Sequence, residues 1–167
     1  MKTRILVLLF IMGLPLFSSC GFYSFTGASI APNIHSVTIK YFPNNAMKVN
    51  PALSQLLTET LKDKFTRETR LQIVDKGGDL EFSGNISDYS ITAIGRNGNQ
   101  AASNQLSISV KVDYVNRVNT KESWNTTITK TSTYDASQNL ASVENDLCTQ
   151  ISKLIADEIF NRSVANW

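Results

Sequence analysis

The chain has 167 residues, with 16 basic and 14 acidic side chains and a formal net charge of +2. So balanced a composition argues against a nucleic-acid-binding protein, which presents a strongly basic face. Two cysteines are too few for a disulfide framework, so an exported form of this chain must be stabilised by its hydrophobic core. The length fits one domain with room for a sizeable core.

Residues 1–19 have the pattern of a secretory signal peptide. Two basic residues precede an apolar run over 5–17, which Gly13 and Pro15 interrupt. This run is shorter than the roughly 20 residues that span a bilayer, so we expect it to be cleaved rather than to remain as a transmembrane helix. Its removal leaves equal numbers of basic and acidic side chains.

The sequence SSCG at 18–21 resembles a bacterial lipobox, which would make Cys20 the first residue of the mature protein. Small side chains before the thiol give the signal peptidase access to the bond, and the thiol receives a diacylglyceryl group. Lipoboxes usually carry Leu three residues before the cysteine, where this chain has Phe17. The alternative is a plain signal peptide with an incidental cysteine. Apart from this diacylglyceryl group and an N-acyl chain, we expect no cofactor.

The mature chain divides into a tether and one domain. Residues 20–33 are uncharged and mix aromatics with Gly, Ser and Pro, which predicts an acylated N-terminal tether. Residues 34–167 then show regular patterns without repeats, which predicts a single α/β domain.

The first predicted strand covers 34–42, with Val37, Ile39 and Tyr41 on one half-buried face. His35 shares this face at its outer end. As the single histidine it is a candidate ligand or base, but a partly buried structural role is the simpler expectation.

A helix is predicted from Pro51 to about Arg70, with Asn50 as its N-cap. Its opposite face mixes acidic and basic side chains, which is typical of a solvated surface. The apolar residues at helical spacing are Leu53, Leu56, Leu57, Leu61 and Phe65.

Residues 71–94 predict two strands joined by a tight turn at Gly77 and Gly78, since glycine permits positive φ. Asp75 and Asp79 flank this turn, but they supply too few oxygen ligands for a calcium loop.

Residues 95–104 are polar and unpatterned, which predicts a loop or hairpin tip. The alternation of apolar and polar residues in 105–119 and 122–135 then predicts a long antiparallel hairpin with one solvent-exposed face.

The last predicted element is a helix over 137–163, in which we expect Cys148 to pack as a small hydrophobe. Its apolar stripe comprises Leu140, Val143, Leu147, Cys148, Ile151, Leu154, Ile155 and Ile159. The elements together predict an α+β fold: a two-layer sandwich with one mixed or antiparallel sheet of about four or five strands and two helices packed on one face.

Catalytic motifs do not emerge from the sequence. It has no Gly-x-Ser-x-Gly elbow, no His-Glu-x-x-His motif and no Cys and His cluster for a metal. A single histidine is also a poor basis for a catalytic triad. We therefore do not expect an enzyme.

Several segments carry a family resemblance. Cys20 with the following GFYSFTG, VTIKYFPNNA at 37–46, VNPALSQLLTETLKDKF at 49–65 and GDLEFSGNISDYSIT at 78–92 are similar to the LptE-type lipopolysaccharide-assembly lipoproteins of Bacteroidetes. The resemblance covers essentially the whole mature chain, and its most specific parts are the tether and the Tyr-Phe-Pro-Asn segment.

The resemblance implies a small α/β lipoprotein that is anchored in the outer membrane and faces the periplasm. Its implied partners are lipopolysaccharide and the LptD-type β-barrel translocon, which it would plug and help to fold. Residues after Cys20 contain no acidic cluster of the kind that directs some Bacteroidetes lipoproteins to the cell exterior, which agrees with a periplasmic orientation.

No motif of the family assigns the contact residues, so the candidates come from sequence context. The Thr-rich stretch 126–133 and the segment 95–104 suit the polar lumen of a barrel. For the phosphates of lipopolysaccharide, or for barrel contacts, the candidates are Arg96, Arg117, Lys121 and Lys130. For each of these four, ordinary solubilising charge is the alternative.

A rival hypothesis is a periplasmic lipoprotein that carries a lipid or another ligand, or that belongs to another envelope assembly. A carrier requires an enclosed apolar cavity, whereas a plug requires a packed core. Sequence patterns do not distinguish the two.

Overall fold

The structure, a computed structural model, describes residues 30–48, 50–97 and 100–164, and for 96, 97 and 100–102 it describes the backbone alone. The predicted signal peptide 1–19, Cys20 and most of the tether lie outside these residues. In chain order the elements are β1 (Ser36–Ile39), α2 (Leu53–Glu68), β2 (Gln72–Ile73), β3 (Leu80–Asn97), β4 (Gln100–Asn116), the 3₁₀ turn η2 (Thr120–Glu122), β5 (Trp124–Asp135) and α3 (Leu140–Val164).

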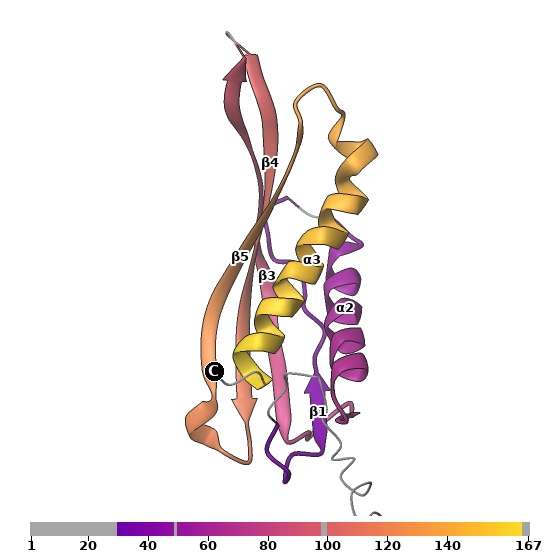
Figure 1. Ribbon diagram of the computed structural model, residues 1–167, viewed down its shortest axis with the longest axis vertical. Coiled ribbons are helices and arrows are strands. Elements are labelled where there is room, and N and C mark those ends of the chain that lie inside the picture. Colours follow the sequence, from indigo (N-terminus) through magenta and orange to yellow (C-terminus); the bar gives the residue numbers. More distant parts are fainter. Residues whose placement is uncertain (1–29, 49, 98–99, 165–167) are drawn as a thin grey trace, which may run out of the picture.

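One mixed sheet and two helices make up the fold. The strands lie in the order β2-β1-β3-β4-β5. Strand β1 is parallel to β2 and β3, whereas β3, β4 and β5 are antiparallel neighbours. Both helices lie on the same face of the sheet (Figure 1). The predicted α+β fold, with a five-stranded mixed sheet and two helices on one face, is confirmed.

The predicted glycine turn is present, but the two strands that it joins do not pair, because β1 lies between them. The connecting segment passes β1 on the side where Thr38 points, opposite the core residues Val37 and Ile39. The Gly78 N–H donates to Thr38 Oγ1 at 3.0 Å. A Cβ on Gly78 would lie 2.7 Å from the Thr38 backbone nitrogen, so a larger residue would push this segment off β1.

The first strand is shorter than predicted, and its two ends differ from expectation. Val37 and Ile39 are buried, but Tyr41 is 59% exposed and His35 is exposed. Strand β1 ends at Ile39, and the alternation of side chains between its two faces ends there too. Beyond this point Phe42, rather than Tyr41, enters the core. The partly buried role expected for His35 is therefore wrong.

Helix α2 begins later than predicted. Its N-cap is Ala52, which provides no side-chain hydrogen bond. Asn50 instead forms a turn before the helix, where its Oδ1 accepts the Ala52 N–H at 3.0 Å. Its Nδ2 donates to Glu144 Oε1 of α3 at 3.0 Å, and Glu144 also accepts the Tyr89 hydroxyl. A local cap was predicted here, whereas the side chain serves a tertiary contact.

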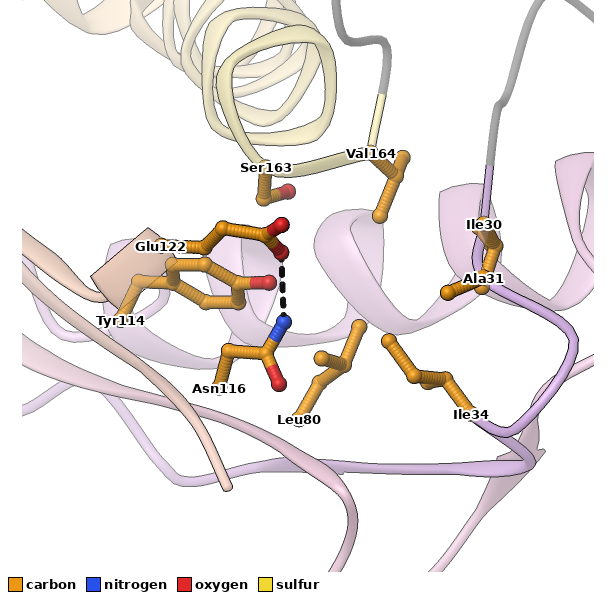
Figure 2. Close-up of a pocket in the computed structure, with 9 residues that line it drawn as sticks. All are labelled: Ile30, Ala31, Ile34, Leu80, Tyr114, Asn116, Glu122, Ser163 and Val164. Atoms are coloured by element: carbon orange, nitrogen blue, oxygen red, sulfur yellow. Dashed lines mark hydrogen bonds between the residues drawn. The ribbon is translucent and has the colours of Figure 1, made fainter. Parts of the chain in front are cut away.

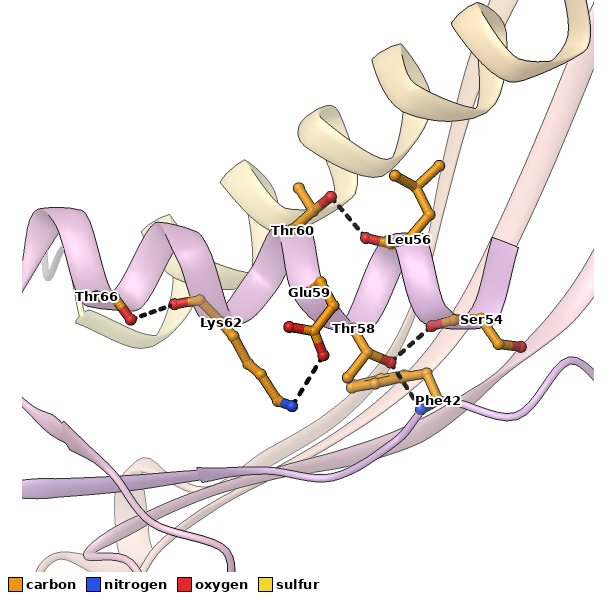
Figure 3. Close-up of polar contacts among 8 residues, drawn as sticks. All are labelled: Phe42, Ser54, Leu56, Thr58, Glu59, Thr60, Lys62 and Thr66. Carbon is orange, nitrogen blue, oxygen red and sulfur yellow. Dashed lines mark hydrogen bonds and ion pairs between the residues drawn. The ribbon is translucent and has the colours of Figure 1, made fainter. Parts of the chain in front are cut away.

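The hydroxyl of Thr58 joins α2 to the chain that follows β1, whereas the hydroxyls of Thr60 and Thr66 bond to carbonyls of α2 itself (Figure 3). Thr58 Oγ1 donates to the Ser54 carbonyl at 2.7 Å and accepts the Phe42 N–H at 3.2 Å. Thr58 is buried, so this bond satisfies a main-chain donor that is removed from water. It holds the helix against the edge of the sheet.

Strands β3 and β4 form a hairpin of 18 and 17 residues. It extends beyond the helices at the top of Figure 1. Most of the segment 95–104, predicted as a loop or hairpin tip, belongs to these strands, and residues 98–99 between them lie outside the described residues. The segment was not predicted as strand because its polar residues show no alternation.

Two backbone features adapt this hairpin to the core. Ile86 pairs with Val110 but Asp88 pairs with Ser109, so a bulge at Ser87 changes which residues face the helices. Both Ile86 and Tyr89 are consequently buried. Gly84 lies so close to β4 that a Cβ would be 2.0 Å from the carbonyl oxygen of Lys111, so no side chain fits there.

The core joins both helices to the sheet through aromatic contacts. Ring centroids 4.9–5.3 Å apart link, in spatial order, Phe160, Phe65, Phe82, Tyr114 and Trp124. Cys148 is buried, as predicted, and burial raises the pKa of its thiol to about 11. Leu154, predicted in the apolar stripe of α3, is 45% exposed, whereas Phe160 is buried.

Within the described part of the chain, neither helix combines the length and the apolar character needed to cross a membrane.

Candidate functional surfaces

The sheet face that points away from the helices is rich in hydroxyl and amide groups. Ser109 and Thr129 lie opposite each other on β4 and β5, with their hydroxyl oxygens 2.8 Å apart. Gln105 pairs with Thr133 and Ser107 with Thr131 in the same register. We call this surface the hydroxyl face; it comprises Ser90, Gln105, Ser107, Ser109, Thr127, Thr129, Thr131 and Thr133.

Only alternate residues of the predicted stretch 126–133 belong to this face. The four odd-numbered threonines are exposed, whereas Ile128 is buried and Lys130 lies on the helix side. This follows from the two-residue period of a strand. A surface of hydroxyls can both donate and accept hydrogen bonds, so it suits a polar partner surface without a fixed charge pattern.

The four predicted cationic residues do not converge. Arg96 pairs with Ala101 near the end of the hairpin, and the structure describes only its backbone. Arg117 and Lys121 follow β4 at the other end of the sheet, at the bottom of Figure 1. Lys130 Nζ lies 3.5 Å from Glu158 Oε2 of α3. These residues therefore cannot form one site.

Arg117 belongs to a compact charge cluster that sequence analysis did not find. Its Nη2 lies 2.5 Å from Glu81 Oε2, and Lys40 Nζ lies 2.5 Å from Glu81 Oε1. Glu81 is 8% exposed, whereas the side chains of Lys40 and Arg117 are about half exposed. Hydrogen bonds from Lys40 and then Arg117 lower the pKa of the Glu81 carboxyl.

This cluster carries one net positive charge, and its two cations retain exposed N–H groups. Such groups form charge-assisted hydrogen bonds with phosphate oxygens. The cluster comes from β1, β3 and the end of β4, so it depends on strand order. In the sequence, the only indication of this cluster is that Lys40 and Glu81 stand directly beside apolar residues of their strands.

A small pocket lies at the end of the sheet where β1 and β3 begin (Figure 2). Its volume is about 210 Å³. Asn116 is fully buried and donates from Nδ2 to Glu122 Oε2 at 2.8 Å. The remaining lining residues are Ile30, Ala31, Ile34, Leu80, Tyr114, Ser163 and Val164.

His35, near this pocket, makes a backbone contact rather than a catalytic one. Asp79 Oδ2 accepts the N–H groups of His35 and Ser36 at 2.8 and 3.0 Å, and the Ser36 hydroxyl at 2.9 Å. The backbone bond from His35 is the main reason why the pKa of Asp79 is lowered. Asp79 thus orders the start of β1.

Neither this pocket nor a second one resembles the cavity of a lipid carrier. The first is smaller than the roughly 300–1,000 Å³ typical of ligand sites. A groove of about 350 Å³ between α2 and α3 is lined mainly by charged residues, with Lys64 held by Glu68 and Asp157. Lipid carriage therefore finds no support in these two pockets.

Comparison with known proteins identifies relatives of this chain. The family model described as LptE, lipopolysaccharide-assembly, matches residues 34–163. No curated protein matches the sequence.

Several solved structures are similar. A hypothetical protein from Chlamydia trachomatis has a TM-score of 0.56 at 9% identity, over 80% of this chain and 99% of that one. A minor lipoprotein from Acinetobacter baumannii has a TM-score of 0.49 at 16% identity, over 77% and 91%. The rare lipoprotein B from Shewanella oneidensis has a TM-score of 0.48 at 16% identity, over 74% and 90%. At these identities the likeness concerns the fold alone.

Proposed function

Because the chain belongs to the LptE family of lipopolysaccharide-assembly lipoproteins, we propose that it is the outer-membrane subunit that occupies an LptD-type β-barrel. There it assists barrel folding and the insertion of lipopolysaccharide into the outer leaflet. Its role is binding rather than catalysis. The observation that carries the barrel contact is the hydroxyl face, which spans three strands. Its charged neighbours are Asp88, which pairs with Ser109, and Lys111, which pairs with Thr127.

The hydroxyl face matches what the interior of a large barrel presents. Such interiors are polar, so a partner inside needs many uncharged donors and acceptors. Ser109 and Thr129 leave lone pairs and protons available beyond their mutual bond. The buried residues Ile108, Val110 and Ile128 on the other side of these strands supply the rigidity of a plug.

The anchor of this subunit is a lipid on Cys20, inserted in the inner leaflet of the outer membrane so that the domain faces the periplasm. Two or more acyl chains make such attachment stable, because a single chain binds only marginally. Removal of Cys20 therefore tests this localisation.

We assign the lipopolysaccharide contacts to Lys40 and Arg117. Both cations are about half exposed, and they share one carboxylate that holds them in position. Arg96 at the hairpin and Lys121 after β4 are separate candidates, because the length of the sheet divides them. Lys130 is the weakest candidate, since Glu158 already neutralises it.

The barrel contact is tested by photo-crosslinking in intact outer membranes. A photoreactive residue replaces Thr131 on the hydroxyl face, and Gln55 on the exposed side of α2 in a matched control. The expected result is a crosslink from residue 131 to a large β-barrel protein, identified by mass spectrometry after mild-detergent purification. If residue 131 gives no barrel adduct while the barrel co-purifies, the proposed contact face is wrong. If no barrel co-purifies, the plug itself is wrong.

The lipopolysaccharide contact is tested by neutralising its two cations. The double variant Lys40→Gln with Arg117→Gln should bind lipopolysaccharide more weakly, with a smaller salt dependence than the unchanged protein. Lys153→Gln, in the groove between the helices, is the control and should bind as before. Thermal unfolding of each variant separates lost binding from lost folding. Equal affinity of the double variant and the control would exclude this pair as the site.

A further inference from the structure

Strand β5 forms a long edge of the sheet (Figure 1). Strand β2 at the other edge has 2 residues, whereas β5 has 12, all of which pair with β4 in an unbroken register. No segment within 30–48, 50–97 and 100–164 pairs with the outer side of β5. Because alternate residues of a strand direct their main-chain N–H and C=O groups to opposite sides, about half of these groups in β5 face outward.

The strand lacks the features that usually block such an edge. Edge strands are commonly protected by proline, by a bulge, by short length or by charged side chains. The sequence of β5, WNTTITKTSTYD, contains no proline, and its register with β4 contains no bulge. Its two charged residues are Asp135 at its end and Lys130, which pairs with Glu158 of α3. The edge is therefore open to a further strand.

An exposed apolar side chain of α3 lies beside this edge. Gln150, Leu154 and Glu158 are spaced by four residues, so they lie along one side of the helix. Gln150 Oε1 accepts the Ser132 hydroxyl at 3.1 Å, and Glu158 Oε2 lies 3.5 Å from Lys130 Nζ, so this side of α3 follows β5. Leu154, between these two contacts, is 45% exposed. A strand added to β5 would come close to it.

The sequence of β5 is nearly symmetric about Thr129. Threonines lie two residues to each side of it, and aromatic residues lie five residues to each side. Two antiparallel copies of β5 that cross at Thr129 therefore place similar residues opposite each other. Threonine pairs and aromatic pairs across strands both stabilise a sheet. The resulting pairs are Thr127 with Thr131, Thr126 with Ser132, Asn125 with Thr133, and Trp124 with Tyr134.

The charges of β5 also fit this register. Lys130 lies opposite Ile128 of the second copy rather than opposite a second lysine, and it keeps Glu158 as its own partner. Asp135 lies opposite Ser123. Such an arrangement is self-complementary, as a two-fold symmetric interface requires. A second copy of the chain is therefore the partner whose chemistry fits this edge.

We propose that β5 is a self-association edge, at which two copies of the chain pair antiparallel about Thr129 with Leu154 beside the paired strands. The pairing itself does not rest on the proposed function. A domain enclosed by a barrel cannot also pair with a second copy, so the dimer is the form of the chain outside the barrel. It covers an edge that otherwise invites aggregation. Its interface is small, which is typical of a reversible association.

The register is tested by disulfide crosslinking of the purified full-length protein in mild detergent. Thr129→Cys and Thr133→Cys each place a thiol on the exposed hydroxyl face, and Cys148 is buried. In the dimer the two copies of residue 129 face each other, whereas those of residue 133 lie roughly 27 Å apart. Mild oxidation should therefore give several-fold more covalent dimer with Thr129→Cys. Equal yields, or none, would overturn the pairing.

Two controls exclude other sources of a covalent dimer. The unsubstituted protein should give none under the same oxidation, which excludes its native thiols. Two chains that share a micelle by chance would crosslink equally through residues 129 and 133. A mixture of Thr127→Cys and Thr131→Cys should crosslink more than either variant alone, because these positions face each other across the two copies. No gain on mixing would overturn the register.

Substitutions at the edge then probe what holds the dimer. Thr129→Glu places two carboxylates opposite each other, and Leu154→Gln removes the apolar contact, so each should raise the dimer Kd several-fold in sedimentation equilibrium. Thr92→Glu adds the same charge to an exposed residue of β3 and should leave Kd unchanged. Thermal unfolding checks that each variant is folded. An unchanged Kd in Thr129→Glu would overturn the pairing, and one in Leu154→Gln would remove Leu154 from the interface.

The outcomes separate this inference from the proposed function. A register-specific dimer of the purified chain supports the pairing whether or not a barrel is found. In outer membranes, chains that co-purify with a barrel should lack the self-crosslink at residue 129. Its persistence there would overturn the exclusion of the dimer by the barrel. A crosslink from residue 129 to a barrel protein, with no self-crosslink in the purified chain, would assign the edge to a barrel strand and overturn the dimer.

Discussion

At the scale of single residues, Glu81 shows how a charge is tolerated in the sheet. Its carboxylate is almost fully buried, yet each oxygen accepts a charged donor, one from Lys40 and one from Arg117. Hydrogen bonds to charged groups are each worth more than neutral ones, which offsets part of the desolvation. Because the pKa of Glu81 is lowered in the folded protein, its stabilising effect is present above the ordinary carboxyl pKa.

Glu81→Gln should therefore lower the free energy of unfolding at neutral pH by about 1–3 kcal/mol. As the pH falls below about 4.3, the ordinary pKa of Glu, the unchanged protein should lose this stability progressively. The variant should lose less over the same range. Chemical denaturation at several pH values measures both effects.

Glu59→Gln serves as the control for this prediction. Glu59 pairs with Lys62 on the surface of α2, and its side chain is 56% exposed. Such surface pairs contribute little, so a change of no more than about 0.5 kcal/mol is expected. A loss as large as that of Glu81→Gln would mean that the burial of Glu81 is not what matters.

At the scale of elements, α3 shows how far an apolar pattern predicts a buried face. The heptad-like spacing placed Ile151 and Leu154 in one stripe, but Ile151 is fully buried and Leu154 is 45% exposed. The helix packs against both α2 and the sheet, and this contact surface excludes Leu154 but includes Phe160. Helix periodicity alone does not say where that contact surface ends.

Ile151→Ala should lower the free energy of unfolding by about 2–5 kcal/mol, since it leaves a cavity between the helices and the sheet. Leu154→Ala should cost no more than about 1 kcal/mol, because its side chain is already half in water. Urea denaturation of the two variants measures this difference. Similar losses in both would contradict the helix orientation described here.

At the scale of the whole molecule, function depends on which end of an elongated fold faces the membrane. The start of β1 and the tip of the β3–β4 hairpin lie at opposite ends of the long axis, and the hydroxyl face lies on the sheet between them (Figure 1). A subunit built this way can present one long face to a barrel.

Cys20→Ala should prevent acylation and move the protein out of the membrane fraction, because the lipid on Cys20 is its proposed anchor. Fractionation with immunoblotting, together with mass spectrometry of the N-terminal peptide, measures this. A variant that remains acylated in the outer membrane would show that the lipid is elsewhere.

Local patterns determined much of this protein from the sequence alone. Both helices, the alternation in β5 and the burial of Cys148 follow from side-chain periodicity, which depends only on near neighbours in the chain. The lipobox-like segment at Cys20 and the family resemblance likewise required no tertiary information, although Cys20 lies outside the described residues.

Only the tertiary structure decided how distant strands meet. It placed β1 between β2 and β3, joined Lys40, Glu81 and Arg117 into one cluster, and set Arg96 a full hairpin length from Arg117. It also showed that the side chain of Asn50, predicted as a helix cap, donates a hydrogen bond to Glu144. Each of these depends on which strands and helices become neighbours, and that choice is made by the packing of the whole core rather than by any local pattern.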